Sequence, residues 1–304
     1  MTSRGEFVSG LLRPMIRSTM ILSRAESYLS AFHDANPGVT SRAFEAMPVR
    51  CGGLEWASTY RALISALPDT DTPLTVLDLA CGDGYLLSLL AAASTPQRHA
   101  LIGVDMSTGE LAAARSRLGD RAALYCGKAQ QLPLASACVD VVFSHLALML
   151  MDDVDGVLRD MRRVSKPGAT FAGLVGARPP PNPALDAFIA LYPTAALQPE
   201  WAGLRLGDRR FRSVDGIREM LAPGFDRVEF AELSMDRRYT PAQLWAWHID
   251  MYDTDLLTTD GREDLRQRYL QALQALCGPQ GDLLFEDRYL QFSVRVLQPD
   301  ATRR

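Results

Sequence analysis

Short apolar runs alternate with helical patterns through the middle of the chain. Apolar runs of four to eight residues, bounded by turn signals, are typical of strands that are buried on both faces. Such an alternation predicts an α/β fold, in which a doubly wound, mostly parallel sheet is covered by helices on both faces. The runs that predict strands cover residues 74–79, 100–104, 122–126, 139–144 and 169–175.

The pattern is less regular on both sides of this region. Residues 1–70 predict a cap of short helices, which glycines interrupt at residues 51–53. Residues 71–304 predict the main domain, and its C-terminal part contains two further alternating stretches that predict strands. Between those two strands we expect a helical lid at about residues 239–285.

Composition narrows the class of protein. The chain of 304 residues is 47% hydrophobic, which is enough for a sizeable core without disulfides. The net charge of −4 and the lack of a long basic run argue against nucleic-acid and anionic-membrane partners. None of the five cysteines forms a C-x-x-C pair, which indicates reduced thiols and no metal site.

The N-terminus predicts a cytoplasmic protein. Its apolar stretch at residues 8–22 is interrupted by Arg13, Pro14 and Arg17, whereas a signal peptide needs an unbroken apolar stretch. No stretch is apolar for long enough to span a bilayer. We therefore expect a small-molecule substrate as partner, with a homodimer as an open alternative.

The segment Val76–Leu86, VLDLACGDGYL, places a glycine-rich turn between a predicted strand and a predicted helix. Such turns commonly hold phosphate groups. Here the dinucleotide pattern G-x-G-x-x-G fails, because Leu87 stands where the third glycine is needed. No lysine or arginine lies between Ala62 and Gln97. A nucleotide-dependent oxidoreductase is therefore the weaker interpretation.

An acidic turn suits a cofactor that has cationic centres and no phosphate. Asp78 and Asp83 would attract positive charge, and Gly82 allows the backbone to approach a ligand closely. Asp105, at the end of the next strand, is placed to accept both hydroxyls of a ribose. Adenosine joined to a sulfonium and an α-ammonium is S-adenosylmethionine, which is the cofactor that we predict.

Four segments together carry a resemblance to a known family: VLDLACGDG, LIGVD, AQQLPLASACVDVVFSHLALMLMDD and RRVSKPGATF. They resemble class I S-adenosylmethionine-dependent methyltransferases of type 11, a group that includes ubiquinone and menaquinone C-methyltransferases and many natural-product tailoring enzymes. The resemblance implies a seven-stranded sheet whose last strand is antiparallel. It covers residues 74–175 strongly and residues 214–297 more weakly.

The resemblance also implies roles for individual residues. Lys128 departs from the family, which often has an acidic residue there beside the adenine amino group. The implied cofactor contacts are Asp78, Ala80, Gly82 and Gly84 at the methionine moiety, Asp105 at the ribose, Met106, Ala129 and Gln130 at the adenine, and Ser144 beside the methionine and the substrate.

Histidines are the candidate general bases, because their ordinary pKa lies near neutrality. His145, just after the fourth strand, is the first candidate, and His248 in the predicted lid is the second. Trp245 and Tyr252 share one helical face with His248, and Tyr28 is a similar aromatic residue in the cap. These aromatic side chains either pack in a core or form the wall of a substrate pocket.

The sequence thus predicts methyl transfer to a small organic acceptor. We expect O- or N-methylation of a secondary metabolite. C-methylation of a quinone-like or keto-acid acceptor is an alternative. A second alternative is a protein that binds S-adenosylmethionine on the same fold without transferring its methyl group.

Overall fold

The computed structural model describes residues 20–93 and 99–297, so most of the N-terminal stretch discussed above lies outside the described residues. The helices are α2 (Arg24–Ala35), α3 (Val39–Phe44), α4 (Thr59–Ile64), α5 (Tyr85–Ala92), α6 (Thr108–Leu118), α7 (Val154–Val164), α8 (Pro183–Leu191), α9 (Val214–Leu221), α10 (Pro241–Ile249), α11 (Tyr252–Asp255) and α12 (Thr259–Gln274). The strands are β1 (Val49–Cys51), β2 (Leu54–Trp56), β3 (Thr75–Leu79), β4 (Ala100–Asp105), β5 (Ala123–Cys126), β6 (Val139–His145), β7 (Ser165–Gly176), β8 (Phe225–Tyr239) and β9 (Leu283–Val296).

One twisted sheet organises the fold, in the order β2-β1-β8-β9-β7-β6-β3-β4-β5. Strands β3 to β7 are parallel, and β9 runs antiparallel to both β7 and β8. Every residue of β3 is buried, as expected for a strand with helices on both of its faces. The doubly wound α/β class and its antiparallel last strand are therefore confirmed. The seven strands from β3 to β9 form the main sheet.

A hairpin adds two strands to the predicted seven. Residues 49–56 were expected to belong to the helical cap, but β1 and β2 pair there with Val49 opposite Trp56. Gly52 and Gly53 both have positive φ, 55° and 84°, which suits a two-residue turn between twisted strands. The glycine signal thus marked a hairpin rather than a helix break.

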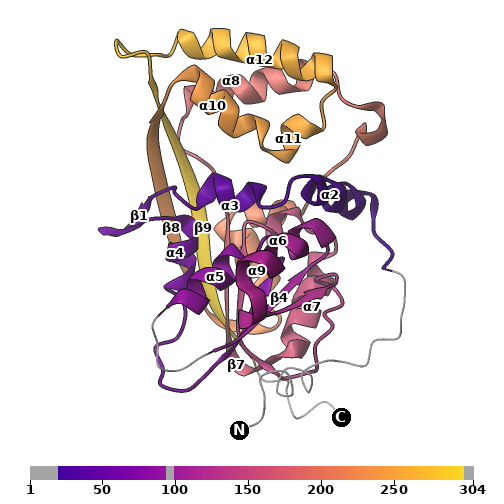
Figure 1. Ribbon diagram of the computed structural model, residues 1–304. Coiled ribbons are helices and arrows are strands. Elements are labelled where there is room, and N and C mark those ends of the chain that lie inside the picture. Colours follow the sequence, from indigo (N-terminus) through magenta and orange to yellow (C-terminus); the bar gives the residue numbers. More distant parts are fainter. Residues whose placement is uncertain (1–19, 94–98, 298–304) are drawn as a thin grey trace.

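Strands β8 and β9 continue beyond the end of β7. The pairing of β7 with β9 ends at Gly176 opposite Tyr289, whereas β8 and β9 stay paired as far as Tyr239 opposite Leu283. This two-stranded ribbon carries α10, α11 and α12, which pack with α8 as a separate layer (Figure 1). We call these four helices the helical lid. The division of the chain at residue 70 stays a prediction.

The strand order places a ligand site at one edge of the sheet. Strand β3 lies between β4 and β6, so the helical crossovers leave it in opposite directions. In open parallel sheets, ligands bind beyond the carboxyl ends of the strands at this switch point. Helices α2 and α3 lie between that edge and the helical lid (Figure 1). Within the described ranges, no helix is both long and apolar enough to cross a bilayer.

Candidate functional site

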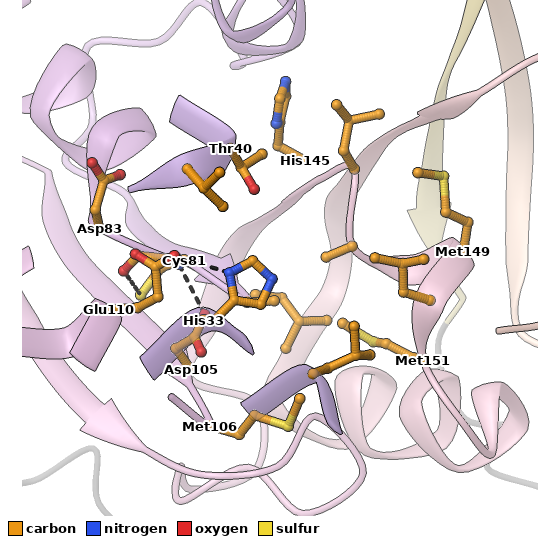
Figure 2. A pocket seen from close by; sticks show the side chains of 18 of the residues that line it. His33, Thr40, Cys81, Asp83, Asp105, Met106, Glu110, His145, Met149 and Met151 are labelled. Atoms are coloured by element: carbon orange, nitrogen blue, oxygen red, sulfur yellow. Dashed lines mark hydrogen bonds and ion pairs between the residues drawn. The ribbon is translucent and has the colours of Figure 1, made fainter. Parts of the chain in front are cut away.

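A cavity of about 310 Å³ lies at the carboxyl ends of β3, β4 and β6. It extends from the glycine turn, under α2 and α3, to the joint between α10 and α11. Figure 2 shows Asp105, Met106 and His33 together on one side, with Met149 and Met151 on the opposite wall. Of the predicted site residues, those that line the cavity are Asp78, Ala80, Gly82, Asp105, Met106, Ala129, Gln130, His145 and Tyr252.

Residues of the glycine turn have two different surroundings. Some line the cavity, and one lies where two helices pack together. Ala80 and Gly82, with positive φ of 59° and 50°, line the cavity. Gly84 also has a positive φ, 73°, but it does not line the cavity. A Cβ on Gly84 would lie 2.7 Å from Leu118 Cδ1 and 3.1 Å from Ala114 Cβ. Gly84 thus allows α5 to pack closely on α6, and its assignment as a cofactor contact is corrected.

Two carboxylates reach the cavity from the ends of neighbouring strands. Asp105 accepts the backbone N–H of Gly82 at 2.8 Å and that of Ser107 at 2.9 Å. Asp78 is buried, and no hydrogen-bond donor reaches its carboxylate among the described residues. Burial and the nearby charges of Asp105 and Asp83 raise the pKa of Asp78 well above its ordinary value. A cation bound beside Asp78 would relieve this cost.

Asp83 has a different partner from the one expected. Its carboxylate pairs with the guanidinium of Arg117 on α6 and accepts a hydrogen bond from Ser41 Oγ at 2.7 Å. Asp83 is therefore paired within the protein, although it also lines the cavity. Its attraction for a cationic ligand is weaker than the sequence suggests, because Arg117 on α6 offsets part of its charge.

The adenine side contains an acidic residue that sequence reasoning missed. Lys128 Nζ lies 2.5 Å from Glu26 Oε2, and Gln130 Nε2 donates to Glu26 Oε1 at 3.2 Å. Glu26 is buried and lines the cavity beside Ala129. The only local signal was the capping box Ser23-x-x-Glu26, which marks the start of α2 and not a site.

His33 and Glu110 are a second pair that sequence reasoning missed. His33 Nδ1 lies 3.0 Å from Glu110 Oε1, and Glu110 Oε2 accepts the backbone N–H of Gly38 at 2.8 Å. Both side chains line the cavity on the same side as Asp105 (Figure 2). They hold α2 and α3 against α6 over the cofactor end of the cavity.

His145 lies in the cavity wall in an apolar setting. Its ring stacks on that of Tyr60 with 3.6 Å between ring centroids, and its Nε2 is 2.9 Å from Thr59 Oγ1. Its Nδ1 has no hydrogen-bond partner among the described residues. Burial lowers the pKa of His145 to about 3, so the imidazole is neutral near pH 7. Ser144 does not line the cavity, and its hydroxyl donates to the carbonyl oxygen of Leu79, so its predicted contact with the cofactor finds no support in this geometry.

Three of the predicted aromatic and histidine candidates do not line the cavity. His248 stacks on Phe188 with 4.2 Å between centroids, and its Nε2 is 3.1 Å from the Tyr269 hydroxyl, inside the helical lid. Trp245 is buried in the same core. Tyr28 donates a hydrogen bond to the carbonyl oxygen of Tyr252 at 2.7 Å and so joins α2 to α11. The contacts of His248, Trp245 and Tyr28 are thus those of packing residues, and their predicted roles as base and in binding substrate find no support in the cavity.

The two buried histidines make the fold sensitive to acid. Burial lowers the pKa of both His145 and His248 to about 3, whereas the unfolded chain takes up these protons below about pH 6.5. The contribution of the two histidines to stability is therefore complete above pH 6.5 and decreases as the pH falls, by about 2 kcal/mol for each histidine at pH 5. Urea unfolding at pH 7 and pH 5 measures this loss. We expect His248→Gln to reduce the loss by about 2 kcal/mol.

The control is His99→Gln, because His99 is less deeply buried and its pKa is lowered less. If the stability of His248→Gln depended on pH as that of the wild type does, buried His248 would not be a cause of the acid sensitivity.

The sequence of this chain is similar to those of known proteins. Residues 77–173 match the family described as the methyltransferase domain. The ubiquinone/menaquinone biosynthesis C-methyltransferase UbiE of Methylobacterium nodulans is 31% identical over 194 residues, which cover 60% of this chain and 75% of that protein. The chain is a class I S-adenosylmethionine-dependent methyltransferase of the UbiE-like group. Its cofactor is S-adenosylmethionine.

Other relatives match less of this methyltransferase or are more distant. A malonyl-acyl-carrier-protein O-methyltransferase of Methylovorus sp. is 34% identical over 103 residues, which cover 31% of this chain and only 34% of that protein. The solved structure of the (4+2)-cyclase SpnF has a TM-score of 0.56 and 16% identity, over 92% of this chain and 98% of that chain. That likeness extends to the lid but shows a shared fold alone.

The cavity fits the cofactor of this methyltransferase. Asp78 provides a buried carboxylate that has no partner in the part of the chain that the structure describes, and an ammonium or sulfonium would neutralise it. Asp105 offers two carboxylate oxygens at the tip of β4 for a ribose, and Met106 lines the wall beside it. Over residues 20–93 and 99–297, no group of three or more His, Cys, Asp or Glu side chains is arranged to hold a metal ion.

Proposed function

We propose that this methyltransferase methylates an oxygen or nitrogen atom of a small, mostly apolar acceptor, such as a secondary metabolite. The proposal rests on the apolar side chains that line part of the cavity. Apart from the predicted cofactor residues, the lining includes Phe44, Met149, Tyr252 and Tyr289, and Phe44 contacts both His145 and Tyr289. An apolar pocket with few polar groups is typical of a site for a small organic ligand.

The charges around the cavity disfavour an anionic acceptor. No arginine lines it among the residues that the structure describes. Its one lysine, Lys128, pairs with Glu26 at the adenine side, and His33 pairs with Glu110. A carboxylate or phosphate would normally be bound by a free arginine or lysine. The malonyl group named for one relative carries a carboxylate and therefore fits this cavity poorly.

His145 is the group best placed to accept a proton. When bound, S-adenosylmethionine supplies the methyl group and a neutral sulfide as leaving group. In the tautomer whose Nε2–H donates to Thr59 Oγ1, the His145 Nδ1 keeps a buried lone pair that no described residue uses and that a bound hydroxyl or amine would have to reach. The acceptor atom becomes far more acidic as it takes the methyl group. A weakly basic imidazole is therefore sufficient, and the remaining catalysis is alignment and exclusion of water.

His145→Ala tests this role. We expect turnover to fall about 100-fold, which is the lower end of what a general base contributes. Affinity for S-adenosylhomocysteine should change less than about twofold, because His145 lies beyond the residues predicted to bind the cofactor. Thr59→Val should give an intermediate loss, since it removes the partner of Nε2. Full turnover in His145→Ala would remove His145 from the mechanism.

A carbon acceptor is the second candidate, and the UbiE relative favours it. That relative is named for C-methylation, and this chain spans three quarters of its length at 31% identity. A quinone-like ring is neutral and apolar, so the same cavity would accept it. Incubation with carbon-13-labelled S-adenosylmethionine and a panel of phenols, amines and quinols decides between them. Label found only on ring carbon would replace the O- or N-methylation proposal.

A further inference from the structure

One acidic side chain that lines the cavity has no role in the chemistry above. Asp287 lies on β9 where that strand leaves the sheet for the helical lid, close to the last pairing of β7 with β9 (Figure 1). Alternate residues of a strand share one face, so Asp287 shares its face with Phe285 and Tyr289, both buried. Phe285 packs against Trp247 in the lid, and Tyr289 packs against Phe44. Asp287 is thus the charged residue in an otherwise apolar row that faces inward.

Among residues 20–93 and 99–297, the Asp287 carboxylate is hydrogen-bonded only to neutral groups. Oδ1 accepts the backbone N–H of Arg288 at 2.8 Å, and Oδ2 accepts the Tyr289 hydroxyl at 2.9 Å. The Arg288 guanidinium instead lies 3.6 Å from Glu232 and donates to the backbone carbonyl oxygen of Asp287. Burial raises the pKa of the Asp287 carboxyl, although both hydrogen bonds and the nearby positive charge of Arg288 oppose this shift. A partly desolvated carboxylate of this kind gains most from a positively charged partner.

Asp287 also lies apart from the proposed base. The ring of Phe44 contacts both His145 and Tyr289, with its centroid 6.1 Å from that of His145 and 5.9 Å from that of Tyr289, the hydrogen-bond donor to Asp287. Both Asp287 and Tyr289 line the cavity, as does Asp250 at the lid joint. Asp287 is thus linked to the His145 region through Tyr289 and Phe44 and has no direct contact with His145 among the described residues. We therefore expect the carboxylate to contact a part of the acceptor other than the atom that is methylated.

We propose that Asp287, supported by Tyr289, is the specificity-determining anchor for a protonated amine on an otherwise apolar methyl acceptor. The aliphatic or aromatic body of the acceptor would lie along Phe44, Met149 and Tyr252, with the ammonium at Asp287. The cavity offers no free cation to compete for this carboxylate, as its described lysine and His33 are paired elsewhere. This inference rests on the proposed transfer to a small apolar acceptor and names its chemical class.

Three probes of equal length and different charge test the anchor. 4-Phenylbutylamine, 4-phenylbutan-1-ol and 4-phenylbutanoate are titrated by calorimetry into the full chain saturated with S-adenosylhomocysteine, at pH 7.5. We expect the amine to bind at least tenfold more tightly than the alcohol, and the carboxylate not to bind. Asp287→Asn should reduce amine affinity to that of the alcohol, leave the alcohol unchanged and allow the carboxylate to bind.

Glu286→Gln is the matched control, because it removes the same charge from the neighbouring residue, which points to the other face of β9 and does not line the cavity. It should keep the preference of the wild type. Affinity for S-adenosylhomocysteine reports whether each variant is folded. The proposal is overturned if wild type fails to bind the amine at millimolar concentration, shows no preference for it, or keeps the preference in Asp287→Asn. If the proposed methyl transfer is wrong, the labelled-methyl assay shows this independently of these binding measurements.

Discussion

Asp105→Ala is expected to weaken the binding of S-adenosylhomocysteine by at least 100-fold and up to about 10,000-fold. The carboxylate is predicted to accept both ribose hydroxyls, and each charge-assisted hydrogen bond contributes about 1.5–3 kcal/mol. Two of them amount to roughly 3–6 kcal/mol, which gives that range of affinity. Asp105 also accepts the backbone N–H groups of Gly82 and Ser107, so its loss loosens the turn that faces the cofactor.

The loss of affinity should come without a comparable loss of stability. Burial raises the pKa of Asp105, and its charge helps to raise that of Asp78, so the native state holds two carboxylates that repel each other. Replacing Asp105 by alanine removes that repulsion and offsets the two lost hydrogen bonds. We expect the midpoint of thermal unfolding to stay within a few degrees of wild type.

Calorimetric titration with S-adenosylhomocysteine measures the affinity, and Asp215→Ala on α9 is the control. Asp215 is 95% exposed and does not line the cavity, so its removal should leave affinity unchanged. If Asp105→Ala binds the product as tightly as wild type while remaining folded, the ribose does not contact this carboxylate.

The prediction of the sheet succeeded because its signals are local. The strand β3 is buried from end to end and stops at a glycine turn, and Asp105 directly follows the apolar run of β4. Because parallel strands end at one edge, a polar residue at a strand end can be placed near the site from sequence alone. The seven-stranded count was taken from the family, and a family pattern does not specify an added hairpin such as β1–β2.

The errors concern partners that are distant in sequence. Asp83 seemed free because no basic residue lies near it in the chain, yet Arg117 reaches it from α6. Lys128 was read as a departure from the family, whereas Glu26 provides the acidic group from α2. Charge pairs of this kind depend on tertiary packing, which local pattern cannot supply.

The side chains that share one face of α10 show a second limit of prediction from sequence. His248 and Trp245 do lie on a buried face, as their spacing predicted. Periodicity indicates that a face is covered but not what covers it. Here α8 and α12 cover it, so these side chains form the core of the lid, and Tyr252 in the next helix lines the cavity instead.

Gly207→Ala is expected to destabilise the protein by roughly 4 kcal/mol. Gly207 has a φ of +72°, a conformation that costs an alanine about 1–2 kcal/mol. A Cβ at this position would also overlap the carbonyl oxygen of Met149 and come within 3.0 Å of Leu150 Cα. Both contacts are with backbone, which cannot move aside as a side-chain tip does, and overpacking of this kind typically costs a further 1–3 kcal/mol.

Gly203→Ala separates these two costs. Gly203 lies four residues earlier, has the same φ of +72°, and has no atom within 4 Å of an added Cβ. Its alanine variant should therefore lose only the conformational cost, about 1–2 kcal/mol by urea unfolding. The difference between the two variants measures how tightly this loop fits against the segment that contributes Met149 and Leu150 to the cavity wall. Equal losses would mean that the loop does not seat against that segment in solution, and the wall of the acceptor end would then have to be formed by other residues.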